Sequence, residues 1–214
     1  MTGSDPSWTD VATAIGTVGA VVVALFGNFL PRLFPPKLSV RLANPLGVRQ
    51  QVQVIYPGGA IPATFETAAR YYQLEAANSR RWVKAHNVRV MLLKIEQRTT
   101  VGWVEAWSGG GIPLVWQHQD ALGSVRTLGP APLADLFHVV QDRDAHGSRA
   151  LVLMPSFAPR GVELVFTVGC DLRVTVPAQS DEADSKPLVV TIHWDGQWED
   201  GTTEMGNHVR LEQD

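Results

Sequence analysis

The sequence predicts a mainly β protein, an antiparallel β-sandwich preceded by one N-terminal transmembrane α-helix. Three observations support this fold class. Residues 11–30 form a run of twenty residues without a formal charge. After this run, apolar and polar residues alternate in short stretches that Pro and Gly interrupt, which is typical of antiparallel strands. Between these stretches the sequence lacks the amphipathic helical periodicity that a parallel α/β fold requires.

The apolar run is long enough to cross a bilayer, because twenty helical residues extend for about 30 Å. A cleaved signal peptide and a buried core helix are the alternatives. Asp5 and Asp10 precede the run without any Lys or Arg, whereas a signal peptide begins with a positive region. The predicted organisation is a short extracytoplasmic N-terminus (1–10), a transmembrane helix (11–30), a proline-rich linker (31–36) and a cytosolic β-sandwich domain (37–214).

The charges that flank the run predict its orientation. Arg32, Lys37, Arg41 and Arg49 follow it, and basic residues are retained on the cytoplasmic side of a membrane. We therefore expect a single-pass protein of the inner (cytoplasmic) membrane, with its N-terminus outside and its C-terminal domain in the cytosol. Cys170 is the only cysteine, so no intrachain disulfide can form, which fits a reducing compartment.

Four small residues recur at every fourth position of the run and share one helix face: Ala12, Gly16, Ala20 and Ala24. Small residues on one face let two helix backbones approach closely. This pattern predicts a homo-oligomer formed through the helix. The alternative is that these residues have no such role, because Ala and Gly are common in membrane helices.

The body is predicted to contain roughly eight to ten short strands, for which eleven stretches are candidates. The candidate strands are 37–43, 52–56, 71–77, 88–96, 113–117, 133–140, 150–154, 163–168, 172–176, 188–194 and 207–212. A short helix is possible over 64–70. Gly109, Gly110 and Gly111 are interpreted as a flexible loop, because the P-loop Lys and Ser or Thr are absent.

Two stretches are similar to immunoglobulin-like domains. Residues 72–78 read YQLEAAN and residues 85–93 read AHNVRVMLL; in those domains a strand ends at Asn and, after a turn, the next begins as A-x-N-V-x-V. Ser79 and Arg80 depart from the pattern, which has Gly after Asn. In layout the chain also resembles uncharacterised bacterial single-pass membrane proteins with a cytosolic sandwich. The resemblance implies a fold class and no activity.

The densest aromatic and polar cluster reads HWDGQWEDG over residues 193–201. Asp195-Gly196 favours a two-residue hairpin turn, in which His193 opposes Trp198. A second interpretation is a ligand or partner surface, because Trp is enriched at binding hot spots. Its candidate residues are Trp194, Trp198, Trp103 and Trp107.

A third interpretation of this cluster is a divalent metal site and a metal-dependent hydrolase. Its ligands would be His193, Asp195, Glu199, Asp200 and His208. No known ligand spacing supports this set, so no metal and no cofactor are predicted.

The one basic cluster contains Arg80, Arg81 and Lys84, with Trp82 inside it and His86 and Arg89 after it. It is either a solvated loop or a contact for anions. Anionic lipid headgroups are the better candidate, because the apolar helix places the domain close to a bilayer and each basic residue there gains about 1 kcal/mol. A phosphate-bearing ligand is the other.

No complete catalytic set is present. The chain has no G-x-S-x-G motif, and Asp171 beside Cys170 disfavours the thiolate. A net charge of −3 argues against a nucleic acid polymer as partner. We therefore predict a non-enzymatic, membrane-anchored binding module with the bilayer and an unidentified protein or small molecule as partners. The alternative is a sensor-effector that binds a nucleotide or other anion and clusters its transmembrane helices.

Overall fold

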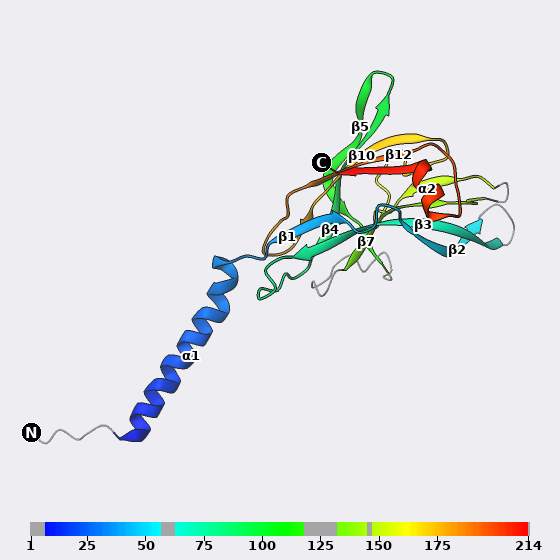
Figure 1. Ribbon diagram of the computed structural model, residues 1–214. Helices are drawn as coiled ribbons and strands as arrows, with labels where there is room; N and C mark the ends of the chain where they lie inside the picture. The colour runs from blue at the N-terminus through cyan, green and yellow to red at the C-terminus, as the bar shows by residue number, and fades with distance from the viewer. Residues whose placement is uncertain (1–6, 57–62, 118–131, 145–146, 214) are drawn as a thin grey trace, which may run out of the picture.

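In the computed structural model a single helix stands away from a β body (Figure 1). The structure describes residues 7–56, 63–117, 132–144 and 147–213. Helix α1 (Trp8–Leu33) has 26 residues and is therefore about 39 Å long. Its C-terminal end adjoins the body at β1, and its N-terminal end lies far from every strand.

The predicted helix over 11–30 is confirmed, and it extends beyond both predicted ends. Every side chain described between residues 11 and 24 is exposed, Ala12, Gly16, Ala20 and Ala24 among them. The structure does not describe residues 1–6, which include Asp5, or the side chains of 10 and 25–33, which include those of Asp10 and Arg32. Among the residues that it does describe, no helix has the length and apolarity that a membrane crossing requires.

The first sheet is built on one long central strand. Strand β3 (Ala63–Asn78) pairs with β2 (Val48–Tyr56) along its first half and with β1 (Leu38–Leu42) along its last five residues. On its other side the order continues through β7 (Leu133–Val140), β8 (Ala150–Leu153) and β9 (Val165–Phe166), and β6 (Val115–Trp116) also pairs with β7. Strand β1 is thus at an edge, where the chain arrives from α1.

The second sheet has β4 (Arg89–Thr99) and β10 (Cys170–Val176) at its centre. Strands β11 (Ala178–Gln179) and β5 (Gly102–Pro113) pair with β4, and β12 (Leu188–Trp194) lies between β10 and β13 (Val209–Gln213). Helix α2 (Thr202–His208) connects β12 to β13. The β4–β5 hairpin projects from the body (Figure 1).

Both sheets are antiparallel and share one core. Alternating residues of the two inner faces form a single apolar cluster, with Leu74 and Phe137 from the first sheet and Ile95, Leu172 and Ile192 from the second, all at most 1% exposed. This arrangement confirms the prediction of a mainly β protein with antiparallel sheets, because alternation along a strand places every second side chain on the same face.

Three local predictions were wrong. Residues 64–70 continue β3 instead of forming a helix, since pairing with β2 and β7 uses their backbone groups. Gly109–Gly111 is part of β5. No hairpin forms at Asp195-Gly196: only Gly196 has a positive φ, of 87°, whereas the predicted turn needs one at both positions. Helix α2 intervenes there, so His193 pairs with Arg210.

Candidate functional site at the base of the helix

The junction between helix and body is organised by Asn78, the last residue of β3. Its side-chain Oδ1 accepts hydrogen bonds from the backbone N–H of Lys37 (3.0 Å) and of Arg80 (3.1 Å). Its Nδ2 donates to the carbonyl of Val83 at 2.6 Å. One side chain therefore fixes the chain that arrives from α1 and the turn that leaves β3.

A second set of contacts attaches the end of α1 to the same turn. The guanidinium Nη1 of Arg80 donates to the carbonyl of Pro35 at 2.8 Å. The rings of Phe34 and Trp82 meet edge to face, with centroids 5.7 Å apart. Both rings remain accessible, since Trp82 is 64% exposed and Phe34 43%. Aromatic and basic side chains thus surround the base of an apolar helix.

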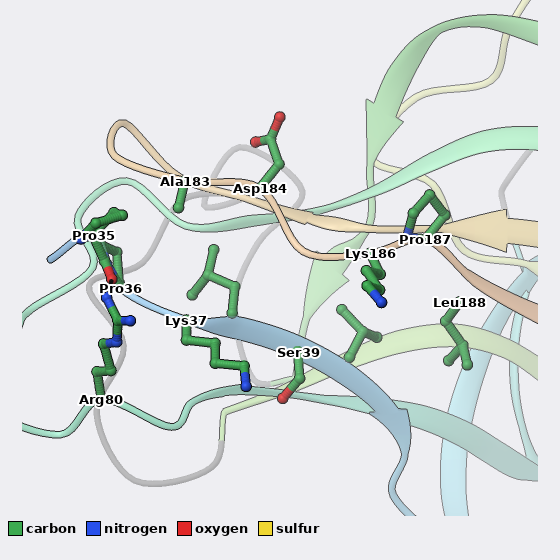
Figure 2. Close-up of a pocket in the computed structure, with 12 residues that line it drawn as sticks. Pro35, Pro36, Lys37, Ser39, Arg80, Ala183, Asp184, Lys186, Pro187 and Leu188 are labelled. Carbon is green, nitrogen blue, oxygen red and sulfur yellow. Dashed lines mark hydrogen bonds between the residues drawn. The ribbon is translucent and has the colours of Figure 1, made fainter.

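A pocket of about 730 Å³ opens beside this junction, between β1 and the segment that leads into β12 (Figure 2). This volume lies in the range of small-molecule sites, roughly 300–1,000 Å³. The pocket is lined by Pro35, Pro36, Lys37, Leu38, Ser39, Val40, Arg80, Ala183, Asp184, Lys186, Pro187 and Leu188. Most of these residues are apolar, and more of the charged ones are positive than negative.

Three cations and one carboxylate line the pocket. In Figure 2 the Lys186 side chain extends from its segment toward β1, whereas the Lys37 side chain lies on the side of β1 away from that segment and the Asp184 carboxylate points away from both. Across the described ranges, no carboxylate lies within ion-pair distance of the Lys37 or Lys186 ammonium. Among the described residues, the ammonium groups of Lys37 and Lys186 are therefore without an ion-pair partner, although Asp184 also lines the pocket.

The far wall of the pocket is ordered by hydrogen bonds within residues 178–186. The Ser185 hydroxyl accepts from the N–H of Ala178 (2.8 Å) and donates to the carbonyl of Lys186 (2.9 Å). Nearby, Glu182 binds His86 Nδ1 at 2.6 Å. Ser185 itself is buried, whereas Asp181 and Asp184 are exposed. These bonds hold Lys186 in place opposite β1.

The basic residues predicted from sequence divide into two groups. Arg80 lines the pocket, whereas Arg81 and Lys84 are exposed on the same turn and do not line it. Sequence reasoning missed Lys186 and the role of Asn78. The only signal for Asn78 was its place at the end of a predicted strand, and nothing in the sequence indicates that Lys186 and Arg80 line the same pocket.

The predicted tryptophan surface is not formed by exposed rings. Trp194 is 3% exposed and Trp198 6%, and both belong to the core. Indole Nε1 of Trp194 donates to the carbonyl of Gln197 at 2.9 Å. The reason is that α2 folds back over this segment, and its Met205 packs in the same cluster. The interpretation of Trp194 and Trp198 as a partner surface therefore needs correction.

The other two tryptophans lie on β5 and are half-buried. Trp107 packs against the core. The guanidinium of Arg173 lies over the Trp103 ring, 4.2 Å from its centroid, which is a cation–π arrangement. A role for Trp103 and Trp107 in ligand binding stays a prediction.

A second pocket of about 420 Å³ collects the histidines of the predicted metal region. His193 Nδ1 lies 2.9 Å from Asp171, and His208 Nδ1 lies 2.8 Å from Asp195. Burial alone would raise the pKa of Asp195, but hydrogen bonds from His208 and Gln197 outweigh it and hold this pKa below its usual value. In the part of the chain that the structure describes, no three His, Cys, Asp or Glu residues form a group able to hold a metal ion.

Cys170 is buried and unpaired at the start of β10. Burial, with a smaller effect of Asp171 and Glu163, raises the pKa of its thiol to about 12. A thiol with this pKa is protonated at neutral pH and is a poor nucleophile.

No family model, no curated protein and no solved structure matches this chain.

Proposed function

We propose that this chain is a membrane-tethered, non-enzymatic binding module, in which α1 enters a lipid membrane and the β body binds a ligand beside it. The observation that carries the proposal is the apolar surface of α1, which stands away from the body. Ile15, Val18 and Val23 are each more than 60% exposed. Full burial of each such side chain gains about 1.5–3 kcal/mol, so a single chain in water leaves a large driving force unused.

The base of α1 has the chemistry expected at a membrane surface. Trp82 and Phe34 meet there, and Arg80, Arg81 and Lys84 occupy the same turn. Tryptophan concentrates at the interface between lipid and water, and basic residues favour anionic headgroups. This pattern supports entry of α1 into lipid up to its junction with the body, on the cytosolic side. A body of two antiparallel sheets gives the helix a rigid base on which a ligand site can be formed.

Flotation of the full-length chain with vesicles of phosphatidylcholine and phosphatidylglycerol tests the tether. The double variant Val18→Asp/Val22→Asp places two carboxylates on α1, each of which costs about 2.5–3.5 kcal/mol in lipid. We expect it to lose most of the vesicle-bound fraction. Val101→Asp is the matched control, because Val101 is 88% exposed in the turn of the β4–β5 hairpin, away from α1.

Equal flotation of the α1 double variant and the Val101→Asp control would disprove the tether. The chain could instead form an oligomer in the absence of lipid. If the α1 substitutions dissociate that oligomer and leave flotation unchanged, other copies of α1 cover this helix.

A second candidate function is a sensor-effector in which a bound anion changes the arrangement of the helices. It is favoured by the position of the pocket, whose wall includes residues 35–37 of the link to α1. Thermal unfolding of the full chain with millimolar nucleoside monophosphates and diphosphates tests this idea. A ligand that binds only the folded state raises the midpoint by linkage, and an unchanged midpoint contradicts the function for nucleotides.

A further inference from the structure

We infer that the pocket beside the junction takes an extended acidic segment of a partner protein, which adds to the free edge of β1 as a further strand of the first sheet. This inference rests on the proposed binding role and deepens it, because it names the class of partner. It does not require that α1 enter lipid.

Strand β1 is an edge strand, since among the described strands it pairs with β3 alone. At one end of this pairing Ser79 N–H donates to the carbonyl of Lys37 at 3.0 Å, and at the other end Ala43 N–H donates to the carbonyl of Gln73 at 2.9 Å. The register between these two bonds has no shift. In an antiparallel ladder, residues bonded to one neighbour alternate with residues whose backbone groups face the other side. The odd-numbered residues of β1 therefore bond to β3.

Leu38 and Val40 consequently direct their N–H and C=O groups away from β3, and both residues line the pocket. In the described part of the chain, no hydrogen-bond partner takes these groups. Unpaired backbone groups at a sheet edge are a template for another strand, and several kinds of peptide-binding domain use such an edge. The pocket thus offers backbone donors and acceptors to an extended peptide.

The pocket has the size of a short strand. One residue of a strand takes about 3.3 Å along the strand, about 4.8 Å between neighbouring strands and about 10 Å across the sheet, which is about 160 Å³. The volume of about 730 Å³ therefore holds about four or five residues, and β1 has five. The pocket lies where the two sheets approach each other, since β1 and β11 come close together there.

The two faces of β1 predict the side chains of the added strand. On the inner face Leu38 is buried and Val40 packs against the core, whereas Lys37 and Ser39 are exposed on the outer face. Residues directly opposite each other in neighbouring strands share a face. The added strand therefore alternates apolar residues, next to Leu38 and Val40, with polar residues next to Lys37 and Ser39.

Charge complementarity selects acidic residues for the polar positions. The cations of the pocket are spread out: Arg80 lies beside Pro35 at one end, Lys186 extends from the opposite segment, and Lys37 lies on the outer side of β1 (Figure 2). Lys37 and Lys186 have no ion-pair partner among the described residues. Cations so separated suit several carboxylates along an extended chain better than one small anion.

Fluorescence anisotropy with the full-length chain in neutral maltoside micelles tests the inference. The probe is a labelled pentapeptide of alternating Glu and Val with Glu at both ends. We expect saturable binding, and at least about tenfold weaker binding when Lys replaces every Glu. Two further peptides carry N-methyl groups on the Val amides or on the Glu amides. Because only alternate amides of a strand face its neighbour, one of these should lose most of its affinity and the other should keep it.

Variants of the edge strand complete the test. Val40→Pro removes an N–H from the free edge and leaves the bonds to β3, and proline is tolerated at such edge positions. It should weaken binding roughly three- to tenfold, as loss of one hydrogen bond does. Val40→Ala is the matched control, because it keeps the N–H, and we expect a change below about twofold.

A pair of double variants separates the pocket from total charge. Lys37→Gln/Lys186→Gln should weaken binding of the Glu-containing peptide at least about fivefold. Arg81→Gln/Lys84→Gln removes the same charge outside the pocket lining and should change the affinity less than about twofold. Equal weakening by the two double variants would overturn the site.

Equal binding of the two N-methylated peptides would overturn strand addition, and this outcome does not depend on the folding of any variant. Displacement of the peptide by an equal concentration of AMP or inorganic phosphate would overturn it in favour of a small anion. A dimer that Val40→Pro dissociates, without peptide binding, would overturn the partner and assign the edge to a second copy of the chain. Lost flotation with intact peptide binding in micelles would refute the tether alone, so the two proposals fail separately.

Discussion

The turn between β3 and β4 and the segment between β12 and α2 contain similar residues but expose them differently. Each has a tryptophan and takes part in a histidine–carboxylate contact, His86 with Glu182 for the first and Asp195 with His208 of α2 for the second. Yet Trp82 is 64% exposed and Trp198 only 6%. Helix α2 and Met205 cover the second region, whereas in the described part of the chain the Trp82 ring meets Phe34 and stays largely exposed. Amino-acid composition alone therefore does not show which region is a binding surface. The element that packs over each region must also be known.

The largest expected difference between the two regions is in stability. Trp198→Ala should lower the free energy of unfolding by about 3–5 kcal/mol, because it leaves a cavity in the core. Trp82→Ala should change it by less than about 0.5 kcal/mol. Urea unfolding followed by circular dichroism measures both. Trp198→Phe is the control, since the indole N–H of Trp198 is buried without a partner in the described structure and its loss costs little. Equal effects of the two alanine substitutions would refute the contrast.

A smaller effect is expected at the residue that fastens the second region to the first sheet. Arg70 is 1% exposed on β3, and its Nη2 donates to the carbonyl of Asp200 at 2.9 Å. Arg70→Met leaves that carbonyl without its donor and should cost about 1–3 kcal/mol in the same unfolding assay. The neighbouring Arg49 pairs with the Asp200 carboxylate at 3.1 Å but is exposed. Arg49→Met should therefore cost less than 1 kcal/mol, and a larger loss from Arg49→Met than from Arg70→Met would contradict this assignment.

The smallest expected effect is on acid stability, and both regions share it. Burial would raise the pKa of Glu182 and of Asp195, but hydrogen bonds, those of their histidines foremost, leave each pKa below its usual value. A carboxyl whose pKa is lowered by folding stabilises the protein above its unfolded pKa, and this stabilisation disappears as the pH falls through the folded pKa. The pairs should thus weaken below about pH 4.

Thermal unfolding from pH 6 to pH 2.5 measures this effect in the unmodified chain and in Glu182→Gln and Asp195→Asn. Each variant should show a shallower decline of the midpoint below pH 4 than the unmodified chain. A decline of the same steepness in all three proteins would assign the acid sensitivity to other carboxyls.

Strands with clear alternation could be predicted from the sequence. Leu38, Val40 and Leu42 alternate with polar residues, and β1 forms there. The predicted strand 188–194 matches β12 residue for residue, and so does 133–140 with β7, although its sequence allowed a helix as well as the favoured strand. Helix α2 could not be predicted, because seven residues that include Gly206 give no periodicity to recognise. Residues 193–198 hold two tryptophans, but their burial depends on α2, so the error at Asp195-Gly196 and the error at Trp194 and Trp198 have one cause.

The candidate site was predictable only in part. Arg80 stood out because it begins a basic cluster after a strand. Its pocket is made of three segments, 35–40, 80 and 183–188, which no local pattern connects. The register of β1 on β3, with Leu38 opposite Asn78, brings the first two together. Sequence patterns predict which residues alternate along a strand. Contacts between segments far apart in the sequence decide which charged side chains line the same pocket.

The hydrogen bonds of Asn78 also determine how the molecule responds to mechanical load. Any tension applied along α1 reaches the body at Lys37, where the backbone N–H meets the Asn78 side chain and the carbonyl accepts from Ser79 N–H at 3.0 Å. These two bonds and the Arg80–Pro35 bond carry the strain before the five residue pairs of the β1–β3 ladder do. The junction therefore separates a load on α1 from the strand pairing of the two sheets.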